Sequence, residues 1–469
     1  MVMMPEDAEQ RLLDGCKTLG NFAEKSGVSQ WEIVAGQDYG IKVEIERGRV
    51  SLAAGGGDGG FGIRVVDGGR YGYAYLGRPE DGESAVNQAL EIARRSPKID
   101  GFSLQTDEGS TIVEEMFFPE VDSLTSTDLL TTADDLLTIT EGICPSATLT
   151  GGGVSAGISA GAILTSEGIE DCGTRSGYSI STQTSIDSDD LLTSGWSGRS
   201  SRKILQNPEE IIEEALWWTT ETRKTSEKIL DVGDYPVIFT DSGVGGLFAT
   251  IVPQATLGDR QARGESFWAG KSGQTVMEDH LSLIDDRTMC GGNDSSGRDA
   301  EGKATRVNKI VENGKLGDAL WSTRDAAEQI SLGNVSSAES TASATRDSYE
   351  SPPHPSAANL TITSSQKTLS RESMIENIGE GFLIGSVMGA HTANPTSGDF
   401  SVTTSHIMRI ENGEIVGSLR QAGISGNLPR SLCGNVILGD LPKPHGGWGG
   451  GSVYVPDMLL HNGIRINPA

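Results

Sequence analysis

The sequence predicts an α+β protein, with an N-terminal α/β domain over residues 1–230 and a mainly antiparallel β domain over residues 231–469. Three observations support this. The chain has 469 residues, which is longer than one ordinary hydrophobic core allows. Helical and β-like segments alternate in the first half, so we expect a mixed sheet with flanking helices there. The second half carries two Asn-Gly hairpin signals and few helical patterns, which favours antiparallel strands.

Four segments of the first half have the signals of helices: residues 6–25, 79–96, 126–143 and 207–218. The first repeats apolar side chains on one helical face. Ser126 or Thr127 is a suitable N-cap for the third. The fourth begins with Asn207 as N-cap and Pro208 in the first turn, followed by acidic residues that favour the positive end of the helix dipole.

The β-like segments alternate apolar and polar residues, and glycine marks their turns. VEIERGRVSL turns at Gly48, and Gly68-Gly69 separates the two arms of FGIRVVDGGRYGYAYL. GYSISTQTSID alternates in the same way. The chain contains 62 glycines without a collagen-type period, which indicates tight turns in a sheet-rich protein.

In the second half, PVIFTD predicts a buried strand that leads into an apolar helix over residues 246–257. Hairpins are expected at 309–320 and 408–419, each with an Asn-Gly turn. A helix is expected over residues 370–379. The Ser-, Ala-, Thr- and Pro-rich segment 333–359 is predicted to be a mobile loop.

The formal net charge of −28 disfavours DNA or RNA as a direct partner, because a phosphate backbone requires a basic surface. The acidic start MVMMPEDAEQ has no signal-peptide pattern, and no apolar run reaches the length of a membrane span. The five cysteines are odd in number and far apart, which argues against disulfides and CxxC sites. We therefore expect a cytoplasmic protein that does not associate with membranes.

Three short motifs resemble known sites but fail in detail. GGGDGG contains a formal GxGxxG, yet a strand pattern follows it where a dinucleotide site needs a helix. AGKSG lacks the first glycine of a P-loop, because Glu265 occupies that position. DSGVGG lacks the flanking glycines of a hydrolase elbow around Ser242, since Thr240 and Val244 stand there.

No two of the six histidines lie one helical turn apart, so a zinc-binding helix of the usual kind is absent. A site could still be assembled from His391, Asp399 and His406, although both histidines could equally be ordinary loop or sheet residues. The acidic residues Asp285, Asp286, Asp294, Asp299 and Glu301 could bind a hard cation, but solvated turns explain them more simply.

The order of several motifs resembles the TldD/PmbA family of zinc metalloproteases. The resemblance covers nearly the whole chain and is carried by these segments: VEIERGRVSLAAGGGDGGFGIRVVDGGRYGYAY, GDRQARGESFWAGKSGQTV, IDDRTMCGGNDSSGRDAEG, IVENGKLGDAL, IENIGEGFLIGSVMG, TSGDFSVTTSHIMRIENGEIV, AGISGNLPRSLCGNVILGD and GGSVYVPDMLLHNG.

The resemblance implies that catalytic members carry HExxxH on the helix before the Gly258-Asp259 pair, with zinc bound by the two histidines and a distal cysteine. The corresponding positions here hold Ala249, Thr250 and Gln254. The cysteine position falls near Trp448. Pro253 also interrupts the helical hydrogen bonds of this segment. The chain thus resembles the PmbA-like members, also called TldE, which lack the motif.

This resemblance implies a subunit of a heteromeric peptidase that acts on small or unfolded peptides, without catalytic residues or a metal in this chain. Its partner would be a TldD-like subunit that carries HExxxH and zinc, and a homodimer is also possible. Asp259, His391, Asp399 and His406 are expected to line the shared cavity. The alternatives are a stand-alone metal-dependent peptidase with an unorthodox site, and a homo-oligomeric binding or scaffold protein.

Overall fold

The N-terminal half of the computed structural model contains one six-stranded sheet, whose strand order is β3-β2-β1-β4-β5-β6. The structure describes residues 7–188, 191–226, 231–446 and 451–468. The strands are β1 (Gln30–Glu46), β2 (Arg49–Asp67), β3 (Arg70–Leu76), β4 (Thr148–Thr165), β5 (Glu170–Ser188) and β6 (Leu191–Ser201). Every pairing in this sheet is antiparallel, so the expected mixed sheet is wrong in this detail.

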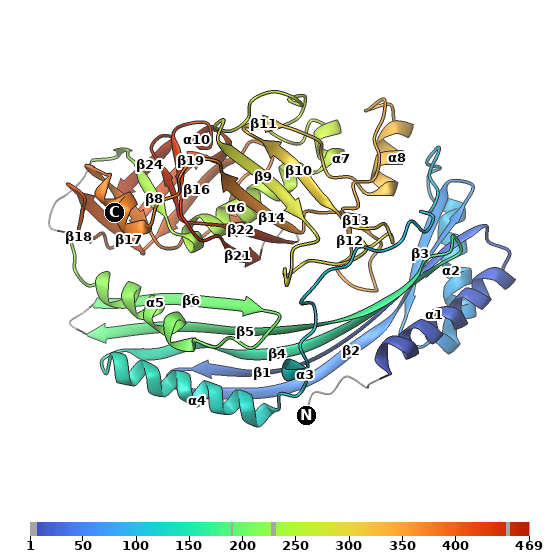
Figure 1. Cartoon of the computed structure of the whole chain (residues 1–469), viewed down its shortest axis with the longest axis horizontal. Helices are drawn as coiled ribbons and strands as arrows, with labels where there is room; N and C mark the ends of the chain where they lie inside the picture. The colour runs from blue at the N-terminus through green and yellow to red at the C-terminus, as the bar shows by residue number, and fades with distance from the viewer. Residues whose placement is uncertain (1–6, 189–190, 227–230, 447–450, 469) are drawn as a thin grey trace.

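Four long helices cover the same face of this curved sheet (Figure 1). They are α1 (Ala8–Lys25), α2 (Gly82–Arg95), α4 (Ser126–Ile143) and α5 (Pro208–Glu221), and the short η1 (Pro79–Asp81) and α3 (Pro119–Asp122) accompany them. Apolar residues of alternate strand positions, such as Ile33, Ile63 and Ile158, are buried under the helices. The other face of the sheet is directed toward the C-terminal half.

The predicted helices are present, with small differences at their ends. The N-cap of α4 is Thr125 rather than Ser126 or Thr127, because Thr125 and Asp128 form a reciprocal capping box. Asn207 does precede α5, but its side chain donates to Glu210 Oε1 at 3.0 Å instead of accepting from the backbone. The first helix begins at Ala8, and residue 6 lies outside the described residues.

The C-terminal half is built from three larger sheets and one two-stranded ladder. The sheet orders are β11-β10-β9-β14-β22-β21, β18-β17-β15-β8-β23-β20, β16-β19-β24-β7 and β12-β13. Pairings are mainly antiparallel, and the β14–β22 and β15–β8 pairs are parallel. The α+β class predicted from the sequence is confirmed. The expected boundary at residue 230 adjoins residues 227–230, which the structure does not describe.

The strands of this half are β7 (Gly233–Asp234), β8 (Val237–Phe239), β9 (Leu281–Asp286), β10 (Val307–Glu312), β11 (Lys315–Leu316), β12 (Ala344–Thr345), β13 (His354–Pro355), β14 (Asn359–Ser364), β15 (Glu380–Ile384), β16 (Asp399–Thr404), β17 (Ile407–Glu411), β18 (Glu414–Ser418), β19 (Ala422–Asn427), β20 (Val436–Leu438), β21 (Lys443–Gly446), β22 (Ser452–Val455), β23 (Met458–Leu460) and β24 (Ile464–Pro468). The helices are α6 (Asp241–Thr256), α7 (Gly258–Ala262), α8 (Thr323–Ser331), η2 (Ala390–Thr392), α9 (Arg371–Glu376) and α10 (Leu428–Ser431).

Both predicted Asn-Gly hairpins form, as β10–β11 and β17–β18. Asn313 and Gly314 have φ angles of 48° and 75°, and Asn412 and Gly413 have 53° and 81°. Two consecutive positive φ angles are the requirement of a type I′ turn, which explains why the Asn-Gly pair predicted the hairpins.

The segment 333–359 differs from its prediction as a mobile loop. Ser343, Ala344 and Asn359 are buried, and β12 pairs with β13 inside the segment. Tyr349 reaches the N-terminal sheet, where its carbonyl accepts a hydrogen bond of 2.7 Å from the Tyr73 hydroxyl. Small polar residues here satisfy buried backbone groups, so the composition did not indicate exposure.

A buried ion-pair cluster joins the two halves. Arg64 of β2 lies directly opposite Glu32 of the neighbouring strand β1 and donates to it at 2.6 Å. Arg64 also donates to Glu301 of the C-terminal half at 3.0 Å. Arg346 adds a second ion pair to Glu32. Although burial opposes ionisation, Glu32 and Glu301 hold the pKa of Arg64 above its usual value. The cluster therefore fixes the sheet against segments more than two hundred residues later in the chain.

The acidic residues expected at solvated turns are largely internal. Asp285, Asp299 and Glu301 are at most 4% exposed. Asp285 accepts from the backbone N–H of Ala358 at 2.6 Å, and Asp299 accepts from that of Ala344 at 3.0 Å. Burial and the neighbouring Glu301 raise the pKa of Asp299 to about 6. These carboxylates organise backbone turns, so their interpretation as a solvated patch was wrong.

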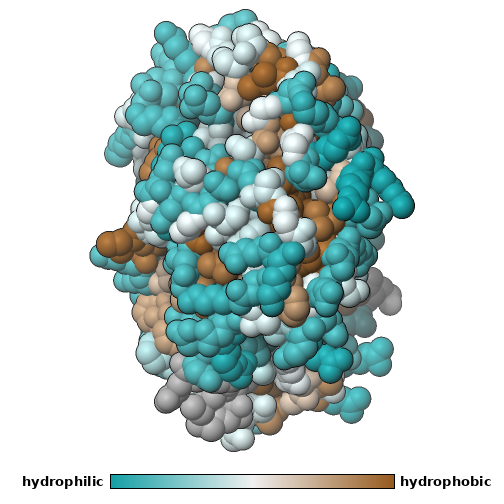
Figure 2. All heavy atoms as spheres, turned by 90° about the vertical axis from the view of Figure 1, so that its right-hand side faces the viewer, coloured by the Kyte–Doolittle hydropathy of each residue, from teal (hydrophilic) through white to brown (hydrophobic). Residues whose placement is uncertain are grey.

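Polar residues dominate the surface on the side of α1 and α2, and apolar side chains there form small separate patches (Figure 2). This agrees with the strongly acidic composition. Among the described residues, no helix is both long enough and apolar enough to cross a membrane.

We predict that Arg64→Met lowers the free energy of unfolding by about 3–5 kcal/mol, because Glu32 and Glu301 would be left as buried charges without their shared partner. Arg78→Met is the matched control, since the Arg78–Asp81 pair is exposed and such pairs contribute less than about 1 kcal/mol. Urea unfolding followed by circular dichroism measures both. Equal effects of the two substitutions would contradict a stabilising role of the cluster.

Candidate functional site

Helix α6 lies in the centre of the C-terminal core, with only one narrow face partly accessible. Its buried side chains include Leu247, Phe248 and Ile251. A helix that is apolar on nearly all sides is expected in the interior. The partly accessible positions recur every four residues along one side; they are Ser242, Gly246, Thr250 and Gln254. This face presents two hydroxyl groups and one carboxamide.

The residues at the zinc positions of the resembled family do not fit a zinc ion. Ala249 is 1% exposed and contributes a methyl group to the core. The Thr250 hydroxyl donates to the carbonyl of Gly246 at 2.8 Å. Structural and catalytic zinc sites use Cys, His, Asp or Glu, whereas a neutral hydroxyl and a carboxamide are poor ligands. The side chains at these positions of the helix therefore do not form a zinc site.

Pro253 and Trp448 are the two remaining positions relevant to a zinc site. Pro253 does not end the helix, which continues to Thr256, whose hydroxyl donates to the Pro253 carbonyl at 2.7 Å. Trp448, near the expected position of the cysteine ligand, lies outside the described residues. Across residues 7–188, 191–226, 231–446 and 451–468, no group of three His, Cys, Asp or Glu side chains is arranged to hold a metal ion.

The residues proposed for a composite metal site have separate surroundings. Asp399 begins β16 at the surface and accepts hydrogen bonds from Asn427 and Ser397, which hold its pKa below the usual range. His391 is an exposed residue of η2, next to α6. Asp259, in the first turn of α7, forms an ion pair of 2.9 Å with Arg263.

His406 connects the two halves of the molecule. Its Nε2 lies 2.7 Å from the carbonyl oxygen of Ser194 in β6, and its Nδ1 bonds to the Ser386 hydroxyl. Because a carbonyl can only accept, Nε2 carries the proton and the neutral ring accepts through Nδ1. The ring also packs against Trp218 of α5, with centroids 5.6 Å apart. Burial lowers the pKa of His406.

Asp241, at the start of α6, belongs to a network of charged and polar side chains that the sequence did not predict. Asp241 is 1% exposed, and its carboxylate oxygens lie 3.2 Å from Lys443 Nζ and from His445 Nε2. Although burial opposes ionisation, these two groups hold the pKa of Asp241 below its usual range. Its backbone N–H donates to Asp457 at 2.8 Å. His445 thus contacts Asp241 rather than Ser242, so no hydrolase triad forms here.

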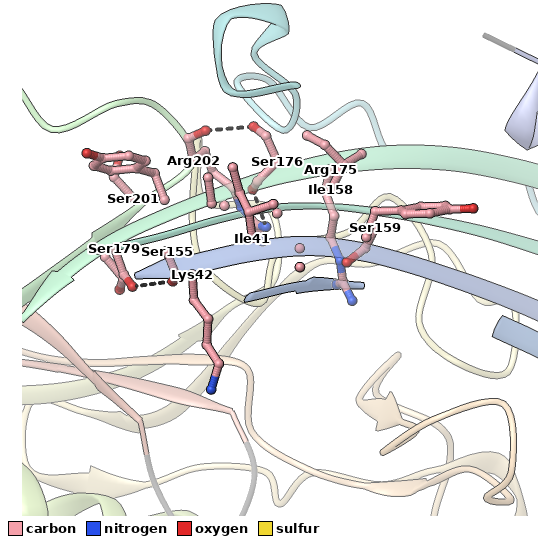
Figure 3. Close-up of a pocket in the computed structure, with 18 of the residues that line it drawn as sticks. Ile41, Lys42, Ser155, Ile158, Ser159, Arg175, Ser176, Ser179, Ser201 and Arg202 are labelled. Atoms are coloured by element: carbon pink, nitrogen blue, oxygen red, sulfur yellow. Dashed lines mark hydrogen bonds between the residues drawn. The ribbon is translucent and has the colours of Figure 1, made fainter. Parts of the chain in front are cut away.

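A cavity of about 650 Å³ lies on the N-terminal sheet (Figure 3). It is lined by residues of β1, β2, β4, β5 and β6, and by Asn293 from the C-terminal half. The four residues expected to line a cavity, Asp259, His391, Asp399 and His406, do not line this one. Its only signal in the sequence was the recurrence of glycine within predicted strands.

Two regions of this chain match the domains of a known protein family. Residues 232–462 match the PmbA/TldA metallopeptidase C-terminal domain, and residues 31–93 match domain 1 of the same proteins. The chain belongs to the PmbA/TldD family. The resemblance inferred from the motifs is thereby confirmed.

Proteins from several organisms are similar to this chain. An uncharacterised protein of Methanocaldococcus jannaschii is 25% identical over 423 residues, which are 90% of this chain and 94% of that protein. The metalloprotease PmbA of Escherichia coli O157:H7 is 26% identical over 237 residues, 50% of this chain and 48% of PmbA. The crystal structure of TldE from Thermococcus kodakarensis has the same fold, with a TM-score of 0.87 at 22% identity, over 97% of this chain and all of that one.

The lowered pKa of His406 predicts a specific pH dependence of stability. The folded protein disfavours protonation of this ring. The neutral ring therefore makes its full contribution to the free energy of unfolding above the ordinary histidine pKa of about 6.5, and this contribution is lost as the pH falls through the lower pKa of the folded state. The loss amounts to about 1.4 kcal/mol for each unit of difference between the folded and unfolded pKa.

We therefore expect the free energy of unfolding of the unmodified protein to fall more steeply from pH 7 to pH 5 than that of His406→Gln. Urea titrations at several pH values measure this difference. The substitution His354→Gln, at a more exposed histidine, is expected to retain the steep fall. The interpretation is wrong if His406→Gln and the unmodified protein show parallel pH profiles.

Proposed function

We propose that this protein is the non-catalytic subunit of a TldD/TldE-type peptidase complex that acts on small or unfolded peptides. The observation that carries the proposal is the composition of helix α6. The family scaffold surrounds this helix, yet Ala249, Thr250 and Gln254 offer neither an imidazole ligand nor a carboxylate base. A subunit of this kind needs zinc only in its partner.

The surroundings of α6 support this role over that of a stand-alone metallopeptidase. The position of Ala249 is filled by core packing, and the Thr250 hydroxyl is used within the helix. A composite metal site is not formed by His391, Asp399 and His406, because each of these side chains has its own local surroundings and the three do not converge on one position. His406 in particular is held between Ser194 and Ser386. A metal ligand would have to leave these contacts.

In the proposed complex, this chain would complete the compartment in which a peptide meets the zinc of a TldD-like subunit. The N-terminal sheet has one face that its own helices leave uncovered, and a cavity lies on that face. Sheets and cavities of this kind can hold extended peptides. The family relatives include proteins named as metalloproteases, TldD homologues among them.

Co-expression with a TldD-like chain that carries HExxxH tests the proposal. We expect the two chains to co-elute in size-exclusion chromatography, and peptide cleavage by the TldD-like chain to increase by at least about tenfold, which corresponds to about 1.4 kcal/mol. The matched control is a TldD-like chain with the HExxxH glutamate changed to Gln, which should bind equally but not cleave.

The proposal fails if the two chains elute separately and cleavage is unchanged. Cleavage by this chain alone, abolished by a chelator, would favour a stand-alone peptidase. A stable homo-oligomer that binds no TldD-like chain would favour a scaffold protein.

A further inference from the structure

The cavity of Figure 3 lies on the sheet face opposite the four helices. Along β4, Ala156 and Ile158 are buried in the core under the helices. Ser155 and Ser159 occupy the alternate strand positions, whose side chains are on the opposite face of the sheet, and they line the cavity. Asn293 of the C-terminal half also lines the cavity. The cavity therefore lies open on the sheet face that is directed toward the C-terminal half, and Asn293 contributes to its edge.

A row of four glycines forms the floor of this cavity. Gly56, Gly40, Gly157 and Gly177 are direct neighbours across β2, β1, β4 and β5. Adjacent strands are about 4.8 Å apart, so the row crosses about 14 Å, the length of about four extended residues. Without side chains, the row exposes backbone to a ligand at close range.

The fold does not require glycine at most of these positions. A Cβ atom at Gly56 or Gly177 would meet no atom within 4 Å, and at Gly40 only the Ala156 carbonyl oxygen, at 3.6 Å. None of the three has a positive φ angle. Glycine inside a strand weakens it, by roughly 0.5–1 kcal/mol relative to alanine. The four glycines leave a trough along the sheet, here meaning the space above the row Gly56, Gly40, Gly157 and Gly177, that is free of side chains and accessible to a ligand.

The charged side chains around the cavity favour a negatively charged ligand. The charged residues of the described chain that line it are Lys42, Arg175 and Arg202, all cationic, in a protein of net charge −28. Figure 3 shows Lys42 with Ser155 and Ser179 on one side, and Ser159 with Arg175 on the other. Lys42 forms an exposed pair with Glu44, at 2.5 Å.

The Arg175 guanidinium has no hydrogen bond or ion pair within the part of the chain that the structure describes. Burial, and to a lesser extent the charge of Arg175, lowers the pKa of Arg202, and Asp294 offsets part of this shift. Two guanidinium groups thus repel each other beside an open cavity. A carboxylate beside Arg175 would offset this repulsion and accept charge-assisted hydrogen bonds from the Arg175 guanidinium.

The trough is closed at the end next to Arg202, where the C-terminal half contacts β6. Arg202 donates to the carbonyl of Gly292 at 3.1 Å and to that of Asn293, and the Asn293 amide donates to Ser200 at 3.3 Å. These contacts attach the C-terminal half to the end of β6. A chain that follows the glycine row from β2 toward β5 therefore ends at this wall, which favours a terminal group over a continuing chain.

We propose that this cavity binds the carboxyl-terminal end of a short extended peptide, with the main chain over the glycine row and the terminal carboxylate beside Arg175. The assignment rests on the proposed peptide-handling role and specifies its ligand. The Ser155 and Ser179 hydroxyls, 2.8 Å apart, can exchange hydrogen bonds with the peptide groups above them.

Fluorescence anisotropy on this chain alone tests the proposal, with N-terminally fluorescein-labelled tetra-alanine as free acid and as carboxamide at low ionic strength. We expect the free acid to bind at least about tenfold more tightly than the amide. Arg175→Gln should remove this preference. Gly40→Val and Gly177→Val should each weaken binding of the free acid by at least about tenfold, because they fill the trough.

Two controls separate these effects from general changes in the protein. Gly173→Val lies on the same strand, where a Cβ also meets no atom within 4 Å, but outside the cavity lining. Arg78→Gln removes an exposed positive charge elsewhere. Both should bind the free acid like the unmodified chain, and circular dichroism verifies that every variant folds.

Equal affinity for acid and amide, or binding unaffected by both valine substitutions, overturns the proposal. An amidated tetrapeptide with an internal glutamate that binds as tightly as the free acid also overturns it, because the carboxylate would then be a side chain. These results are independent of co-elution with a TldD-like chain, so failure of the ligand assignment and failure of the proposed function are distinguishable.

Discussion

The buried ion pairs of Arg64 determine how the two halves of the molecule face each other. Arg64 contacts Glu32 of the same sheet and Glu301 of the C-terminal half, and all three are at most 2% exposed. Ions in such surroundings are stable only when each keeps its partner at short distance, so the arrangement tolerates little sliding of one half against the other. His406, bonded to Ser194, fixes the opposite end of the sheet. Between these two attachments lies the sheet face that carries the glycine row.

Helix α6 shows how a family scaffold persists without the residues expected for metal chemistry. Its apolar side chains hold the C-terminal sheets together, and this packing does not depend on a metal. Asp241 fixes the first turn through its contacts with Lys443 and His445. Substitution of metal ligands on such a helix removes chemistry and leaves the core intact. In the proposed role, the chain would keep the shape needed for a peptidase assembly, and zinc binding would be left to the TldD-like subunit.

Much of the local structure could be predicted from the sequence, because its causes are local. The Asn-Gly turns needed two positive φ angles, and the amphipathic helices needed only their own periodicity. Long-range partners could not be predicted in this way. The segment 333–359 has the composition of a loop, yet Arg346 and Tyr349 within it contact β1 and β3 of the N-terminal half. Asp299 is buried because Ala344 supplies a backbone partner. The glycine row in the cavity depends on the register of four strands, which no single motif encodes.

The metal content of the purified protein tests the central claim most directly. After incubation with excess zinc and removal of unbound metal, elemental analysis by mass spectrometry should find well below one zinc per chain, and His391→Ala should not change that amount. The TldD-like chain treated in parallel should retain zinc at about one equivalent. One tightly held zinc per molecule of this protein, lost on substitution of His391 or Gln254, would contradict the account.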